Sequence, residues 1–241
     1  MSTIVVDIIN PYFIAGNVTL NGIPVRNNTL GTIIGIGSQA AENATGAASN
    51  SVAIGKSALQ QATTGYNNTA LGNGALQSCT GYENTGLGRN AGFLSTTGYN
   101  NIFIGSGVYG STVTASNEIT LGNVAHTVLR CAVTTITSLS DARDKTDIEE
   151  LSVGLDFIKT LNPVKFTWNE RDEEGRKGFK DFGFLAQDLK QSQESTGEAD
   201  VLRLVYEENP DKLEASYGKL VPILVKAVKE LSAKVEALEN A

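Results

Sequence analysis

The chain has 241 residues, enough for one large domain or two smaller ones, and a net charge of −7. This acidic balance argues against nucleic-acid binding, no apolar run approaches the roughly 20 residues of a membrane helix, and the start lacks the basic region of a secretory signal. Two cysteines and one histidine exclude a disulfide framework, a histidine metal cluster and a histidine-based triad, so we expect no metal and no cofactor.

The composition changes abruptly near residue 140. Residues 1–139 hold four Lys/Arg, four Asp/Glu and 19 of the 25 glycines, whereas residues 140–241 carry the whole net charge. We therefore expect two domains of different character. The first 30 residues include alternating stretches such as "NVTLNGIPV". We expect them to attach the chain to a larger assembly or to begin its β-structure.

Residues 31–139 contain a repeat. An aliphatic residue followed by glycine recurs at spacings of 18, 17, 16, 17 and 17, and "TGYNN" or "TGYEN" precedes three of these pairs. The period fits a short strand, a tight turn and a return stretch, and such coils must stack to build a core. We expect small apolar side chains inside and Asn, Thr and Ser outside. The aliphatic anchors are Ile36, Ile54, Leu71, Leu87, Ile104 and Leu121.

Two features of the repeat suggest other functions. "AIGKS" is similar to the end of a phosphate-binding loop, but Asn50 stands where that motif needs glycine, so we interpret it as a structural turn. Tyr66, Tyr82 and Tyr99 could stack on sugars, but their periodicity favours a repeated packing role. With only Glu42, Glu83 and Glu118 as carboxylates, the repeat offers little for a paired-carboxylate glycanase.

The repeat motifs carry a first resemblance. "NSVAIGKSA" resembles the β-roll heads of trimeric bacterial adhesins, and "TGYNNTALGNGAL" is similar to repeats of phage tail fibres and spikes. The resemblance covers roughly residues 31–123. It implies a trimeric β fibre of the β-roll or β-helix type.

Residues 140–241 have the pattern of an ordinary α+β domain. "VGLDFIKTLNPVKFTW" predicts a helix from Val153 to Leu161, ended by Pro163, and a strand through Phe166 and Trp168. "NERDEEGRKGFKD" predicts a hairpin loop, "FGFLAQDLKQS" a strand that leads into a helix, and "VLRLVYEENPDKLEASY" a second strand pair.

A C-terminal helix over about residues 219–239 is the clearest element. Apolar residues step by 3 and 4, the seam of a coiled coil, and Pro222 fits its first turn. Val at a and Leu at d favour dimers, whereas the repeat favours a trimer; because the seam spans only three heptads, we let the repeat decide. The seam residues are Val221, Leu224, Val228, Leu231, Val235 and Leu238.

"SLSDARDKTDI", residues 138–148, lies at the change in composition. A serine becomes a nucleophile when a neutral lysine accepts its proton, and Ser140 stands five residues before Lys145. On a helix this spacing would turn the two side chains away from each other, so a reactive pair needs a turn or a bulge. Spacing alone favours a capping Ser140 and a solvated Lys145.

The order of the motifs carries a second resemblance. "SDARDKTDI", "LNPVKFTW", "GFLAQDL" and "YGKLVPILVKAVKEL" together resemble the C-terminal intramolecular chaperone of endosialidases and other phage tail spikes and fibres, from Ser140 to about Glu239. The resemblance implies a domain that trimerises, guides assembly of the preceding fibre and cuts its own chain at Leu139–Ser140. It implies Ser140 and Lys145 as the catalytic pair, with Asp141 and Arg143 as supporting residues.

We therefore expect a homotrimeric tail fibre or spike whose chaperone releases itself in a single turnover. It would be assembled in a host cytoplasm and carried on the virion, with other tail or baseplate proteins and a host surface receptor as partners, and without nucleic-acid binding or membrane insertion. The alternatives are an adhesin that keeps its trimeric cap uncleaved, and a serine–lysine hydrolase acting on other substrates.

Overall fold

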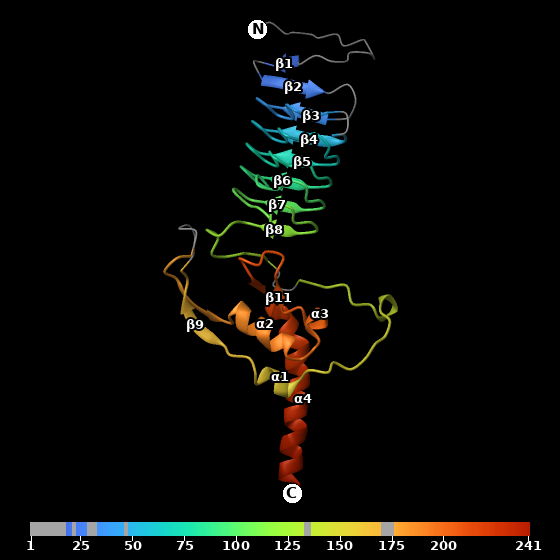
Figure 1. The fold of residues 1–241 in the computed structure, drawn as a ribbon, viewed down its shortest axis with the longest axis vertical. Coiled ribbons are helices and arrows are strands. Elements are labelled where there is room, and N and C mark those ends of the chain that lie inside the picture. The colour runs from blue at the N-terminus through green and yellow to red at the C-terminus, as the bar shows by residue number, and fades with distance from the viewer. Residues whose placement is uncertain (1–17, 21–22, 28–32, 46–47, 133–135, 170–175) are drawn as a thin grey trace. The chain divides into compact units, whose positions relative to one another are not determined.

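A computed structural model describes residues 18–20, 23–27, 33–45, 48–132, 136–169 and 176–241 (Figure 1). The chain divides into two units, residues 1–126 and 127–241, which are described separately. Most of the predicted attachment segment, residues 1–30, lies outside the described residues. Two strands within it are described and belong to the sheet of the first unit.

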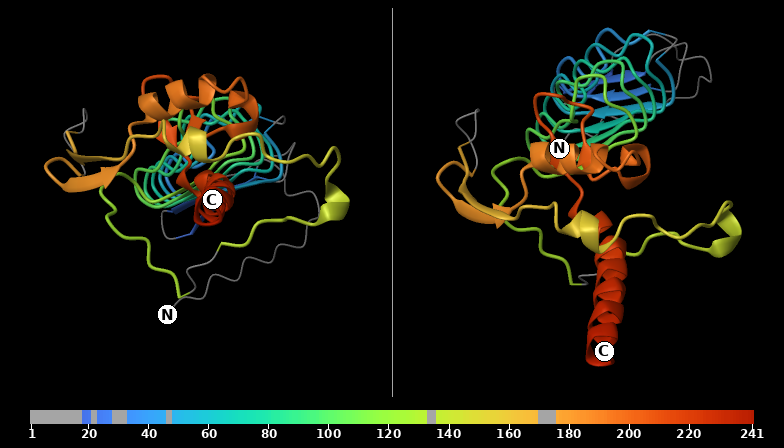
Figure 2. Two further views of the ribbon diagram at one scale, coloured as in Figure 1. Left: turned by 90° about the horizontal axis from the view of Figure 1, so that it is seen from below. Right: turned by 60° about the horizontal axis from the view of Figure 1, so that its bottom comes forward.

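The first unit is a β-solenoid built on one eight-stranded sheet whose strands follow sequence order (Figures 1 and 2). β1 (Val18–Leu20) and β2 (Ile23–Asn27) form an antiparallel hairpin, and β2 pairs antiparallel with β3. The following strands are parallel to one another, so each coil returns to the same edge. The predicted repeat fold is confirmed. The parallel strands are β3 (Ile33–Ile36), β4 (Ser51–Ile54), β5 (Thr69–Leu71), β6 (Thr85–Leu87), β7 (Ile102–Ile104) and β8 (Ile119–Leu121).

The strand register matches the repeat alignment made from the sequence. Ile36 lies opposite Ile54, and each later anchor lies opposite the next one. A glycine follows every anchor because the chain turns there with positive φ. At Gly55 φ is 129°, and a Cβ would lie 2.4 Å from the carbonyl oxygen of Gly72. A side chain at this position would collide with the neighbouring coil.

The interior of the solenoid is narrow and filled mainly by small side chains. Alternate strand residues point inward, and Ala53, Ala70 and Phe103 are fully buried. Leu59 and Leu76 fill the space from the return stretch and are also fully buried. This alternation leaves the anchors of the same strands facing outward.

The expectation that asparagine forms the outside was wrong for one column. Asn68, Asn84 and Asn101 are buried, and each uses its side-chain amide across neighbouring coils. Asn84 Nδ2 donates to the carbonyl oxygen of Gly98 at 2.9 Å, and Asn84 Oδ1 accepts from the backbone N–H of Asn101 at 3.1 Å. A buried amide is tolerated because both its donor and its acceptor are satisfied.

The three repeated tyrosines form a stack. The ring centroids of Tyr66 and Tyr82 are 5.0 Å apart with a 6° angle between planes, and those of Tyr82 and Tyr99 are 4.9 Å apart at 7°. Both faces of the middle ring are thus covered by its neighbours. This arrangement fits the repeated packing role rather than a row of sugar platforms.

The second unit is a small α+β fold. β9 (Val164–Thr167) and β10 (Lys180–Gly183) pair antiparallel, and residues 170–175 of the predicted charged loop between them lie outside the described residues. α2 (Ala186–Glu194) follows, as predicted, and then the short α3 (Ala199–Leu202). The second predicted strand pair is β11 (Val205–Tyr206) with β12 (Glu214–Ala215). A 3-10 turn, η2 (Tyr217–Lys219), leads into α4 (Leu220–Glu239).

The helix predicted from Val153 to Leu161 is shorter than expected. α1 spans Leu155–Ile158, because Gly154 is not helical and the Thr160 hydroxyl bonds the carbonyl oxygen of Phe157. The unit has one modest core in which α1 packs against α4. Its buried members are Val153, Phe157, Leu202, Leu204, Leu220 and Ile223.

Candidate functional site

The stretch that begins at Ser140 folds into a tight turn. Asp141 is extended and its Oδ1 accepts a hydrogen bond from the backbone N–H of Arg143 at 2.9 Å, which caps the 3-10 turn η1 (Ala142–Asp144). The guanidinium of Arg143 binds the same carboxylate, with Nη2 2.6 Å from Oδ2. These side-chain and backbone bonds of Arg143 hold the pKa of Asp141 below its ordinary value, so the carboxylate stays charged at neutral pH.

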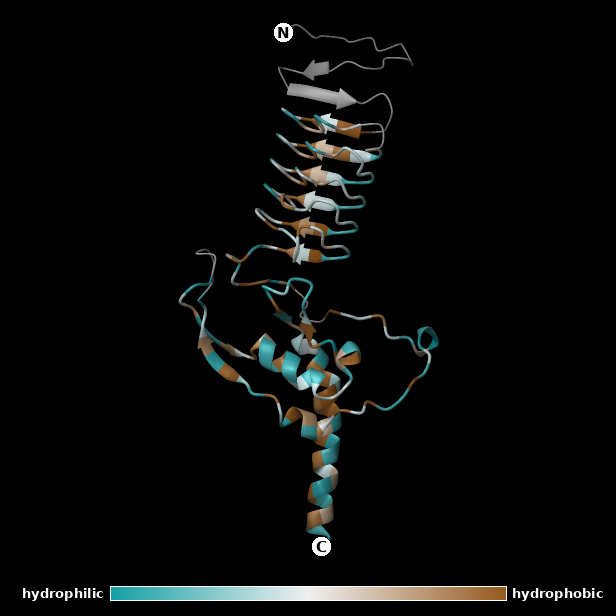
Figure 3. Cartoon of the chain, in the orientation of Figure 1, coloured by the Kyte–Doolittle hydropathy of each residue, from teal (hydrophilic) through white to brown (hydrophobic). Residues whose placement is uncertain are grey.

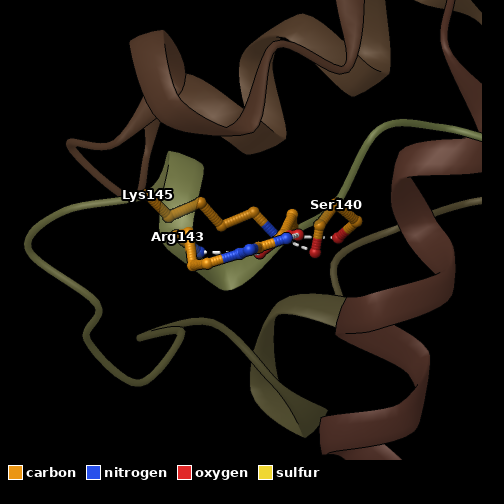
Figure 4. A network of polar contacts seen from close by, with 4 residues as sticks. Ser140, Arg143 and Lys145 are labelled. Atoms are coloured by element: carbon orange, nitrogen blue, oxygen red, sulfur yellow. Dashed lines mark hydrogen bonds and ion pairs between the residues drawn. The ribbon is translucent and has the colours of Figure 1, made fainter.

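This turn brings the predicted pair together. The backbone N–H of Lys145 bonds the carbonyl oxygen of Ala142, and the lysine then leaves the turn in an extended conformation. Lys145 Nζ lies 2.7 Å from Ser140 Oγ and 3.2 Å from the Ser140 carbonyl oxygen (Figure 4). The first distance is suitable for proton transfer between a serine hydroxyl and an amine. The supporting residues Asp141 and Arg143 therefore position the turn rather than touch the hydroxyl.

The surroundings of the pair are open. Ser140 and Lys145 are exposed, and Leu139, the residue before the predicted scissile bond, is 99% exposed. Within the described residues of this chain, the site has no apolar cover. The single chain thus supplies the geometry of a serine–lysine pair but not the burial that such a pair requires.

Helix α4 has two apolar faces with different roles. Leu220, Ile223 and Ala227 are buried against the core of the unit. The predicted coiled-coil seam lies on other positions and is not covered by the chain itself. Exposure along the seam runs from 44% at Leu224 to 77% at Leu238.

Two charged residues of α4 have a role that sequence reasoning missed. Glu230 accepts a hydrogen bond from the backbone N–H of Leu155 at 2.7 Å and so caps α1 from another element. Lys226, one turn earlier, donates to the carbonyl oxygen of Leu151. A Cβ on Gly154 would lie 2.5 Å from the Glu230 carboxylate, so a side chain there would displace Glu230 from its bond to the Leu155 amide. Leu155 and Glu230 are 75 residues apart in the sequence, so no local sequence pattern predicts their contact.

The described residues contain no group of three or more His, Cys, Asp or Glu side chains placed to bind a metal ion. In the same part of the chain, no helix combines the length and apolarity required to cross a membrane. Cys79 is buried and Cys131 is exposed, and neither is in a disulfide.

Comparison with protein-family models places a match in the second unit. Residues 140–198 match the family model described as "Chaperone of endosialidase". The search of curated proteins and the search of solved structures each found no match. The family match begins at Ser140, includes the whole turn that carries the serine–lysine contact, and leaves the β-solenoid outside. It supports an intramolecular chaperone domain of the endosialidase kind in the second unit.

Proposed function

We propose that the chain is a homotrimeric phage tail fibre or spike protein whose C-terminal domain assembles the trimer and then releases itself by cutting Leu139–Ser140. The contact of 2.7 Å between Lys145 Nζ and Ser140 Oγ, next to an exposed peptide bond, carries this proposal. The β-solenoid fits the fibre part, and the family match from Ser140 fits the chaperone part.

The chemistry is an internal acyl transfer followed by hydrolysis. Neutral Lys145 takes the proton of the Ser140 hydroxyl, and Oγ attacks the carbonyl carbon of Leu139 through a five-membered ring. The C–N bond breaks as Lys145 returns the proton to the Ser140 nitrogen, which leaves an ester between Leu139 and Ser140 Oγ. Water then hydrolyses the ester to a Leu139 carboxylate and a free hydroxyl. Because nucleophile and carbonyl belong to adjacent residues, no substrate pocket is needed.

Assembly must supply what the single chain lacks. In the proposed trimer, α4 pairs along its exposed seam, and neighbouring copies cover the loop that carries Lys145. Burial away from water favours the neutral amine and so activates the base. The chain therefore stays intact until copies meet. The same proposal places the protein on the virion, with other tail or baseplate proteins and a host surface receptor as partners.

Two other functions use the same features differently. A trimeric adhesin would keep its C-terminal domain as a permanent cap, and it would remain full-length after assembly. A serine–lysine hydrolase for other substrates would turn over many times. The exposed Leu139 bond immediately before Ser140 favours self-cleavage over both.

Gel analysis and intact mass of the purified full chain test the proposal. We expect two fragments, 1–139 and 140–241, the second beginning Ser-Asp-Ala, and only full-length protein from Ser140→Ala and Lys145→Ala. Lys145→Arg keeps the positive charge but cannot act as a base, so it should also remain uncut. Lys159→Ala is the matched control, because Lys159 is an exposed lysine of the same unit. It should cleave as the unmodified chain does.

The ester intermediate gives a second, chemical readout. Hydroxylamine attacks esters but not ordinary peptide bonds, so it should speed the appearance of fragments and leave a hydroxamate on Leu139. An unmodified protein that forms trimers yet stays full-length, with or without hydroxylamine, would refute self-cleavage and favour the permanent cap.

A further inference from the structure

The outward face of the solenoid sheet is an uncovered apolar surface. The anchors that follow the inward strand positions stand one above another over six consecutive strands, and none of them is buried. Leu71, Leu87 and Ile104 are 44%, 43% and 40% exposed. We call the surface formed by these anchors and by the outward residue two positions before each of them the outer face. Those further residues are Ile34, Val52, Thr69, Thr85, Ile102 and Ile119. The residues of the outer face are aliphatic or threonine, and none of them is charged. Figure 3 shows the strands that carry them coloured mainly from white to brown, the neutral to hydrophobic part of its scale.

Such a face is unusual on a protein that works as a single copy. Contiguous apolar surface on a soluble protein marks a contact site, and uniform rows of aliphatic side chains present the same surface on every coil. We propose that the outer face is the contact between copies of this chain, with the copies parallel, level with one another and facing a common axis. This inference rests on the homo-oligomeric fibre proposed above and identifies its self-contacting surface.

The charges at the rims of the face support a parallel arrangement. Glu83 stands just before β6 and Arg89 just after it, so the same coil carries an acid on one rim and a base on the other. Both side chains are exposed, and neither forms an ion pair within the described part of the chain. Around an axis parallel to the fibre, the Glu83 rim of one copy meets the Arg89 rim of the next at the same level.

Glu83 also departs from its sister coils. The equivalent positions hold asparagine, as at Asn67 and Asn100, and all adopt positive φ. Asparagine tolerates this conformation better than glutamate does, so Glu83 carries a conformational cost that its neighbours avoid. A charge retained at that cost is consistent with an ion pair that only a second copy can complete.

Cysteine cross-linking of the full chain tests the contact directly. Leu87→Cys is placed on the outer face and Leu94→Cys outside the strands, in a Ser140→Ala, Cys131→Ser background that gives one species without an exposed native thiol. The two leucines are matched in exposure, 43% and 44%. Mild oxidation should convert most of the Leu87→Cys chain into a covalent dimer on a non-reducing gel, whereas Leu94→Cys should remain single.

The mass of the unoxidised protein separates the possible failures. An oligomer whose Leu87→Cys chains do not cross-link overturns the outer-face contact and leaves the proposed fibre intact. A single chain in solution overturns both. Equal cross-linking of Leu87→Cys and Leu94→Cys also overturns the assignment, because the face would then have no special proximity.

Charge reversal tests the parallel register. Glu83→Arg and Arg89→Glu should each weaken association roughly tenfold, because like charges then meet at each rim. The combined reversal should restore most of the affinity, since opposite charges meet again. A double variant as weak as either single variant overturns the parallel, level arrangement.

Discussion

Phe103 gives the sharpest test of how the repeat builds its core. In the coil of Ala70, both that inward alanine and a leucine of the return stretch, Leu76, are fully buried in the interior. In the coil next to Phe103 the equivalent of that leucine is Gly92, since Leu76 and Gly92 bond corresponding carbonyl groups of the following coil. A Cβ on Gly92 would lie 2.6 Å from the Phe103 ring and 2.6 Å from Leu76 Cδ2, so both side chains fill the space that Gly92 leaves. The phenylalanine on the strand side of the interior thus fills space that a leucine of the return stretch fills in the sister coil.

The magnitudes follow from this exchange. Phe103→Ala empties a fully buried site and should cost about 3–5 kcal/mol of unfolding free energy. Gly92→Leu alone should also be destabilising, by roughly 1–3 kcal/mol, because it overpacks the same space. The double variant places a leucine on the return stretch beside a small inward residue, as in the coil of Leu76 and Ala70, and leucine is already accepted with positive φ at Leu59 (48°) and Leu76 (47°). It should recover at least roughly 2 kcal/mol relative to the sum of the single changes.

Thermal unfolding at one fixed scan rate, followed by circular dichroism in the Ser140→Ala background, measures these differences. For a chain of this size, about 3–5 kcal/mol corresponds to roughly 6–20 °C in Tm. Leu94→Ala is the control, because Leu94 is exposed, and it should shift Tm by at most about 2 °C. If the double variant is as unstable as the two single losses added together, the volume-exchange argument is wrong.

Three further predictions concern buried polar groups and capping. Asn84→Leu should cost roughly 2–4 kcal/mol in the same thermal assay, because it leaves the amide of Asn101 and the carbonyl of Gly98 buried without partners. Burial raises the pKa of the Cys79 thiol from 9.0 to about 11. The stabilising contribution of the thiol is therefore present below pH 9 and is lost as the pH rises toward 11. The Tm difference between the native chain and Cys79→Ala should shrink across that window. Glu230→Ala should lower the unfolding free energy by about 1 kcal/mol, and hydrogen exchange should show that the Leu155 amide has lost its protection. Glu230→Gln should keep part of both the stability and the protection.

The repeat was predictable because its physical constraints are periodic in the sequence. Glycine after each anchor is dictated by positive φ and by the approach of the next coil, so the spacing of these pairs already fixes the strand register. The inward asparagines were not predicted, because a buried amide looks unfavourable until its ladder of partners is known. The signal was present, since the second asparagine of "TGYNN" recurs at Asn68 and Asn101 in phase with the anchors.

The contact between Ser140 and Lys145 shows the opposite case. A sequence spacing of five from Ser140 to Lys145 is compatible with contact or separation, and only the turn capped by Asp141 decides between them. That cap is visible in the sequence as an acid before a short turn, but its consequence depends on three-dimensional closure. The contact of Glu230 with α1 was beyond prediction for a related reason, since it joins elements 75 residues apart.

The exposure of the reactive pair also bears on the order of events in the proposed function. A chain that cut itself before meeting its partners would lose the α4 seam while its outer face was still uncovered. In the single chain Lys145 is exposed and lacks the burial that the proposed base requires, so the proposed reaction waits for assembly. In the proposed function, cleavage after assembly would remove α4 from copies whose solenoids already contact one another. Separation of the fibre then requires all copies to come apart without the element that brought them together, so its lifetime depends on the height of a barrier rather than on an equilibrium.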